Sequence, residues 1–203
     1  MILNNEIKCG DIISENSLAQ TLEMSRTPVR EAVQNLCNEG YVNIQKGVGI
    51  LVKNVTLKEV HDINAVREVL EKYAIRNAVN EIQDYQLDDL IDRWRGLKES
   101  YNNGTNYDHL ELFDLDEETH QLFINSSGND LVKTLISTLQ SKIHRYQKMF
   151  TTIANDDVHT INQHIGILEA IKERDADKAC DLLERHIYST LARIFENNKG
   201  DLY

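Results

Sequence analysis

An aspartate and a histidine in the second half of the chain have the spacing to act together on one ligand. Asp116 and His120 are four residues apart, so on a helix their side chains lie one turn apart on the same face. That face is apolar, because Leu112, Phe113 and Phe123 also project from it. Burying an unpaired carboxylate costs several kcal/mol, so Asp116 needs a cation, hydrogen bonds or a proton.

Two further histidines are expected to point into the same core. His164 and His186 have isoleucines or leucines three and four residues away, the positions that share a helix face. His144 and His159 have mainly polar residues at those positions and are expected to face solvent. The inward-facing histidines are therefore His120, His164 and His186.

A divalent metal ion would satisfy the buried carboxylate, because imidazoles on neighbouring helices of a bundle can converge on one point. Three imidazoles and one carboxylate suit zinc first, with nickel or manganese as alternatives. The competing interpretation is a set of hydrogen-bonded core histidines, one of them bonded to Asp116. Spacing alone favours this simpler arrangement, because an Asp-x-x-x-His pair is a weak signal.

These side chains need a helical scaffold, and the sequence after residue 55 predicts one. Apolar residues recur there with helical spacing, while asparagine, glycine and aspartate clusters mark the breaks. The pattern predicts an antiparallel bundle of about six helices as a domain over residues 56–203. The predicted helices span residues 56–80, 85–103, 107–125, 129–152, 157–173 and 176–197.

The first 55 residues predict a separate domain with a helix-turn-helix. A short helix over Ser14–Leu22 is followed by Ser25, a good helix N-cap, and by Pro28 in the first turn of a second helix. Arg26 and Arg30 then lie one turn apart, beside Thr27. Such a face suits the major groove of DNA.

A hairpin is expected directly after this second helix. Residues 41–45 and 50–53 alternate like strands, and the segment between them contains Lys46 and Gly49. A hairpin in this position is a wing, and Lys46 is placed to meet a phosphate. The predicted fold is thus mainly α, with an N-terminal winged helix-turn-helix followed by the bundle.

Charge is distributed unevenly along the chain. The whole sequence of 203 residues has a net charge of −11, but residues 1–55 carry only −1 and residues 56–203 carry −10. DNA binding must therefore depend on locally placed cations and on dimerisation. Three scattered cysteines favour a reducing compartment, and no signal peptide or membrane span is indicated, so we expect a cytoplasmic protein.

Residues 10–52 resemble the winged-helix domain of GntR-type bacterial transcription regulators. The resemblance rests on the Leu18-Ala19 pair, the run from Ser25 to Ala32, the Glu39-Gly40 pair and Gly49. Cys9 stands in place of the usual proline, Val48 in place of a basic wing residue, and the first helix, Met1 to Ile7, is expected to be shortened. The resemblance implies that Ser25, Arg26, Thr27, Pro28, Arg30, Lys46 and Gly49 contribute to DNA binding.

Residues 57–197 resemble the FCD ligand-binding domain of the FadR branch of that family. In the metal-containing members an aspartate and three histidines hold the ion, and Asp116, His120, His164 and His186 match them, which reverses the balance of spacing alone. The effectors of such members are typically small carboxylates. Arg67 could bind such an acid or form a salt bridge with Glu71. The other expected effector-binding residues are Asn129, Arg145 and Tyr146.

The resemblance implies a homodimeric, effector-controlled regulator that binds a palindromic operator in double-stranded DNA, by default as a repressor. One alternative is a regulator that senses the metal itself without an organic effector. Another is a metal-dependent hydrolase, but no nucleophile or base is evident beside the four ligands. We therefore expect a protein that is not an enzyme.

Overall fold

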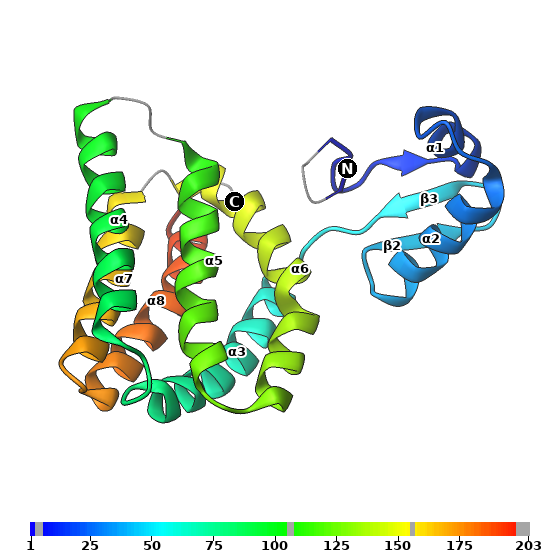
Figure 1. Ribbon diagram of the computed structural model, residues 1–203. Helices are drawn as coiled ribbons and strands as arrows, with labels where there is room; N and C mark the ends of the chain where they lie inside the picture. The colour runs from blue at the N-terminus through cyan, green and yellow to red at the C-terminus, as the bar shows by residue number, and fades with distance from the viewer. Residues whose placement is uncertain (3–5, 105–107, 155–156, 198–203) are drawn as a thin grey trace. The chain divides into compact units, whose positions relative to one another are not determined.

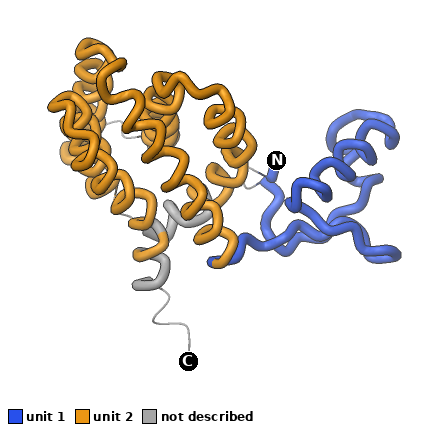
Figure 2. Tube along the Cα trace, turned by 90° about the horizontal axis from the view of Figure 1, so that it is seen from below, with its two compact units in different colours: residues 1–57 blue, residues 58–203 orange. Residues whose placement is uncertain are grey.

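The computed structural model describes residues 1–2, 6–104, 108–154 and 157–197. By its internal contacts the chain divides into two compact units, Met1–Leu57 and Lys58–Tyr203, which Figure 2 colours blue and orange. Within the described residues, none of the helices has the length and apolar character needed to cross a membrane. The expected first helix, Met1 to Ile7, includes residues 3–5, which lie outside the described residues.

The N-terminal unit is a winged helix-turn-helix. Its strands form a small antiparallel sheet in the order β1-β3-β2, in which Ile12 pairs with Leu51 and Val42 with Val52. Strand β1 was not predicted, because two residues are too short to show an alternating pattern. The elements of this unit are β1 (Ile12–Ile13), α1 (Glu15–Thr21), α2 (Arg26–Asn38), β2 (Val42–Gln45) and β3 (Gly49–Val52).

The second unit is built from helices alone in its described residues (Figure 1). Helix α7 packs against α4, α5 and α8, and α6 packs against α5 and α8, so α5, α7 and α8 enclose a common interior. These helices follow the predicted ranges closely. They are α3 (Leu57–Ala78), α4 (Asp84–Asn103), α5 (His109–Ser126), α6 (Asp130–Ala154), α7 (Asp157–Lys172) and α8 (Ala176–Asn197).

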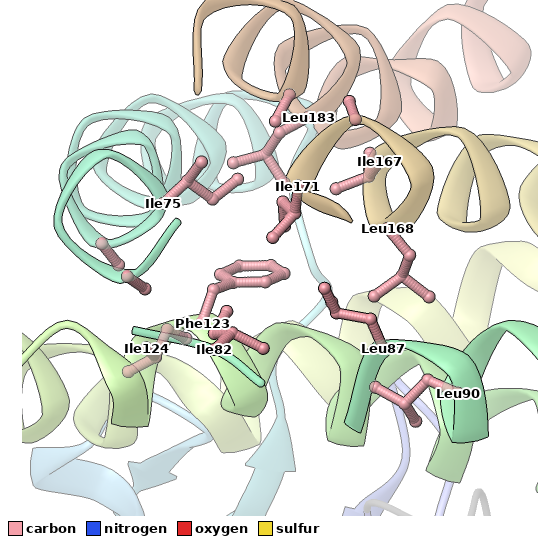
Figure 3. Close-up of a cluster of buried hydrophobic side chains, with 14 of the residues drawn as sticks. Ile75, Ile82, Leu87, Leu90, Phe123, Ile124, Ile167, Leu168, Ile171 and Leu183 are labelled. Carbon is pink, nitrogen blue, oxygen red and sulfur yellow. The ribbon is translucent and has the colours of Figure 1, made fainter. Parts of the chain in front are cut away.

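One end of this interior is a continuous apolar core (Figure 3). Phe123 of α5 is fully buried among aliphatic side chains that come from α3, α4, α7 and α8. Such close packing stabilises the unit through the hydrophobic effect and holds each helix in a fixed rotation about its axis. The core residues labelled in Figure 3 are Ile75, Ile82, Leu87, Leu90, Phe123, Ile124, Ile167, Leu168, Ile171 and Leu183.

Candidate metal centre and DNA-contacting helix

Three helices bring the four predicted ligand residues together beside the apolar core. Asp116 and His120 come from α5, His164 from α7 and His186 from α8, and all four side chains are buried. One ligand atom from each residue can be chosen so that all four atoms lie within 4.8 Å of one another. Spacing on single helices therefore identified residues that the fold brings to one point.

The separations between these atoms are close to those between ligand atoms that share one metal ion. Oδ1 of Asp116 lies 3.1 Å from Nε2 of His164 and 3.7 Å from Nε2 of His186, and the Nε2 atoms of His120 and His186 are 3.3 Å apart. Ligands at about 2.0 to 2.2 Å from a common centre have separations of this order. The second carboxylate oxygen of Asp116 accepts a hydrogen bond of 3.1 Å from Gln147.

The outer ring nitrogens determine where the imidazole protons lie. Nδ1 of His120 is 2.6 Å from Oε2 of Glu71, Nδ1 of His164 is 2.9 Å from the carbonyl oxygen of Thr160, and Nδ1 of His186 is 3.1 Å from Oε1 of Gln163. Each of these partners is an acceptor, so each Nδ1 carries the proton and donates it. The three Nε2 atoms then face the interior of the cluster, on the side of the Asp116 carboxylate.

Four buried polar atoms this close together need either shared protons or a cation between them. Among the described residues, Nε2 of His164 is buried and has no hydrogen-bond partner. Burial works to raise the pKa of Asp116, but the nearby imidazoles, His164 first, hold it well below its usual range. Burial and the neighbouring imidazoles lower the pKa of His186 well below its ordinary value. An anionic carboxylate and neutral imidazoles are the donor set that a divalent cation requires.

Trp94 is a part of the site that the sequence did not reveal. Its indole, on α4, stacks on the His164 ring with centroids 4.3 Å apart and planes 10° apart. Its Nε1 donates to Oγ1 of Thr119 at 2.9 Å. Only the packing of α4 against α5 and α7 could have identified Trp94.

A buried polar network extends from the four ligand residues to α3. Arg67 donates from Nε to Glu71 at 2.8 Å and from Nη1 to the hydroxyl of Tyr146 at 2.9 Å. Tyr146 donates in turn to Asn64 at 2.8 Å. Burial works to raise the pKa of Glu71, but Arg67 and His120 outweigh it and lower this pKa to about 2. The salt-bridge interpretation of Arg67 is therefore the arrangement present in the structure.

The other two expected effector-binding residues are Asn129 and Arg145. Asn129 is at the start of α6, where its Oδ1 accepts from the backbone of Leu131 and Val132 at 3.1 and 3.2 Å. Its Nδ2 donates to the hydroxyl of Tyr73 at 3.1 Å, so these contacts account for its side chain as a helix cap. Arg145 is buried next to Tyr146 in the sequence of α6.

Helix α2 presents an exposed polar face at its N-terminus. Ser25 is its N-cap residue, Pro28 lies in its first turn, and Arg26, Thr27 and Arg30 are exposed. The guanidinium of Arg30 forms a forked pair with Glu15 of α1, with contacts of 3.0 and 3.1 Å to Oε2. Sequence patterns could not predict this pair, because its two residues lie on different helices and are fifteen positions apart.

The two wing residues differ in what they contact. Lys46 is exposed at the turn between β2 and β3. Gly49 has φ of +138°, and a Cβ there would lie 2.8 Å from the carbonyl oxygen of Ile13. Glycine at this position therefore lets β1 pair with β3.

Comparison with known proteins identifies both units. The family model "Bacterial regulatory proteins, gntR family" matches residues 1–52, and the FCD domain model matches residues 62–189. A Bacillus subtilis HTH-type transcriptional regulator, YdhC, is 27% identical over 180 residues, which are 88% of this chain and 79% of the relative. The HTH-type transcriptional repressor RspR of Escherichia coli is 25% identical over 181 residues, 88% of this chain and 77% of the relative.

The fold also resembles that of solved regulator structures. The solved structure of Escherichia coli McbR/YncC superposes with a TM-score of 0.73 at 21% sequence identity, covering 96% of this chain and 92% of that one. The relatives are regulators and not enzymes, which removes the hydrolase alternative. The buried Asp-His₃ cluster is of the kind with which FCD domains often bind metal. The chain therefore belongs to the GntR family of bacterial transcription regulators, with an FCD domain as its helical unit.

Proposed function

We propose that this regulator is a homodimeric repressor whose affinity for a palindromic operator is controlled by a small carboxylate effector at a metal site. Asp116, His120, His164 and His186 would hold the divalent ion, with zinc first and nickel or manganese as alternatives. The expected site of action is the bacterial cytoplasm, where the operator DNA is. The repressor assignment rests on family resemblance and on the similarity to RspR, which is a transcriptional repressor.

The observation that carries this proposal is the orientation of the three imidazoles. Every Nδ1 faces an acceptor outside the cluster, and one ligand atom from each ring and one from Asp116 lie within 4.8 Å of one another. Without an ion, these atoms would have to be satisfied by protons shared across the 3.1 and 3.3 Å contacts, because an unsatisfied buried acceptor costs about 1–3 kcal/mol. A divalent cation satisfies all four groups at once.

The chain's own residues would then orient an acid near the ion. When bound, the ion supplies coordination positions that can accept a carboxylate oxygen. Arg67 is buried on α3 within hydrogen-bonding reach of Glu71 and Tyr146, so it adds a fixed positive charge close to His120. Arg67, Arg145 and Tyr146 are the proposed effector contacts. Asn129 is a weaker candidate, because its side chain already caps helix α6 and bonds to Tyr73.

Helix α3 is the element through which such binding could reach the DNA-binding unit. Only residues 53–56 separate it from the wing strand β3. Its side chains Asn64, Arg67 and Glu71 are all buried, and Glu71 contacts a ligand residue directly. A shift of α3 would change the spacing of two recognition helices in a dimer, which sets operator affinity.

Dimerisation is supported by an apolar stripe on the outside of α3. Val66, Val69 and Tyr73 share one face of this helix and are 47%, 68% and 44% exposed. Tyr73 bonds to Asn129, and from there the exposed Leu131 and Leu135 continue along α6. Exposed apolar patches of this kind mark protein contacts, and a second copy would double the DNA contacts of a domain with little positive charge.

Elemental analysis tests the metal site. Full-length protein loaded with Zn²⁺ and passed through a desalting column should retain about one ion per chain. The variant Asp116→Asn should retain almost none, and His144→Gln, which changes a histidine outside the cluster, should match the wild type. Absence of retained metal in the wild type would refute the proposal.

DNA binding is tested separately. Operators selected from a random DNA library should bind wild-type protein, and Arg26→Ala should weaken binding by about 1–3 kcal/mol if the arginine contacts a base. Unchanged affinity would remove Arg26 from the DNA interface. The second candidate function, a metal sensor without an organic effector, would be favoured if operator affinity responded to metal but to no member of a panel of organic acids.

A further inference from the structure

The three imidazoles of the cluster differ in what receives their outer proton. His164 donates to a backbone carbonyl and His186 to a side-chain amide, and both acceptors are neutral. His120 donates to Glu71, a carboxylate, at the shorter distance of 2.6 Å. A charged acceptor at that distance makes a stronger hydrogen bond than a neutral one.

Glu71 belongs to α3, which supplies none of the four candidate ligand atoms. Its side chain is only 1% exposed, so water does not screen its charge. Its two oxygens have separate partners, since Oε1 accepts from Arg67 at 2.8 Å and Oε2 receives the His120 proton. Arg67 thus fixes the Glu71 carboxylate, and the carboxylate in turn orients the His120 ring.

The support behind Glu71 leads back to the other side of the cluster. Arg67 donates to Tyr146, Tyr146 donates to Asn64, and Asn64 donates at 3.0 Å to the carbonyl oxygen of Ile187. Ile187 follows His186 in α8, and Nε2 of His186 lies 3.3 Å from Nε2 of His120. The buried chain of hydrogen bonds therefore joins the two imidazoles from behind, through α3 and α6.

We propose that Glu71 is the positioning residue of the metal centre. By accepting the Nδ1 proton of His120, it fixes the tautomer and rotation that aim Nε2 at the ion, and its charge makes that nitrogen a stronger ligand. This inference rests on the proposed metal site. It assigns to α3 the role of setting metal affinity without supplying a ligand.

The test compares Zn²⁺ affinities of full-length proteins by competition with a chromophoric chelator. Glu71→Gln keeps an acceptor oxygen but removes the charge, and it should weaken Zn²⁺ binding by about 10- to 100-fold. The matched control is Glu68→Gln, which removes a carboxylate from the same helix one turn earlier. Glu68 pairs with Lys72 at 2.9 Å and contacts none of the ligand residues, so its affinity should equal that of the wild type.

A double-mutant cycle shows whether Glu71 acts through His120. In a His120→Ala background the imidazole through which Glu71 acts is absent. The further change Glu71→Gln should therefore alter Zn²⁺ affinity by less than about two-fold, which is the usual scatter of such comparisons. A full additional loss in that background would overturn the inference. So would equal Zn²⁺ affinity of Glu71→Gln and the wild type. A wild type that binds no Zn²⁺ would instead refute the proposed metal site.

Glu71→Gln leaves the buried Arg67 without its charged partner and could therefore impair folding, which circular dichroism would reveal. The double variant Arg67→Met/Glu71→Leu removes both charges, and such replacements are often neutral for stability. It should fold and show the same or a greater loss of Zn²⁺ affinity. Wild-type affinity in this folded variant would overturn the inference.

Discussion

The substitution Asp116→Asn separates a metal centre from an ordinary buried histidine cluster by its effect on stability. If Asp116 only paired with a protonated His164, the substitution would break a buried charge pair. It would then cost about 3 to 5 kcal/mol of unfolding free energy, with or without metal. In a metal centre the carboxylate is also a ligand, with Oδ1 3.1 and 3.7 Å from Nε2 of His164 and His186. An amide there keeps the size of the side chain but removes the charge that a cation requires, so the variant should in addition lose the stabilisation that metal gives the wild type.

The effect of metal can be given a size. Zn²⁺ at about 1,000 times its Kd stabilises a native protein that binds one ion by about 4 kcal/mol, which corresponds to about 8 to 16 °C in unfolding midpoint for a unit of this length. All four ligand residues lie in the helical unit. Zn²⁺ should therefore raise the unfolding midpoint of residues 58–203 in the wild type and leave the midpoint of residues 1–57 unchanged.

Differential scanning calorimetry at pH 8, with chelator or with excess Zn²⁺, measures both quantities. The control is His144→Gln, because His144 pairs with Glu117 at 2.9 Å outside the cluster. This variant should retain the full Zn²⁺ shift, while Asp116→Asn should lose it. A loss of several kcal/mol in metal-free Asp116→Asn, together with a wild type that does not respond to Zn²⁺, would refute the reasoning.

Three more predictions follow from single contacts. Trp94 is the only tryptophan in the chain and stacks on His164, so Ni²⁺ should lower its fluorescence in the wild type; an equal response in Asp116→Asn would contradict this. Gly49→Ala should lower the unfolding free energy of residues 1–57 by about 1–3 kcal/mol without changing metal content, because φ is +138° and the added Cβ would lie 2.8 Å from the carbonyl oxygen of Ile13; unchanged calorimetric stability would argue against this strain. Val69→Asp should give monomers in sedimentation equilibrium, whereas Leu110→Asp, on exposed α5 surface, should not; dimers of both would exclude the α3 stripe as the interface.

Local sequence patterns predicted the helix ranges and which histidines face the interior of the bundle. Helical spacing relates residues on one element, so it found the ranges of α3 to α8 and the inward-facing histidines. It also offered the pairing of Arg67 with Glu71, one turn apart on α3, as one of two interpretations of Arg67. Each of these inferences depends on neighbours three or four residues away.

Contacts between distant segments could not be predicted in this way. Trp94 meets His164, Glu71 meets His120 and Glu15 meets Arg30 only because particular helices pack together at particular rotations. Strand β1 is two residues long and exists because Gly49 allows close approach to β3. The sequence thus located the four residues of the buried cluster but not the residues that support them.

The most direct test of the whole account is the affinity of the protein for a selected operator as the metal site changes state. Fluorescence anisotropy would compare metal-free protein, Zn²⁺-loaded protein, and Zn²⁺-loaded protein with each of a panel of small carboxylic acids. We predict that at least one acid changes operator affinity of the loaded wild type by about 5- to 150-fold, and that Asp116→Asn does not respond. Identical operator affinity of the wild type in every state would contradict control of DNA binding through this site.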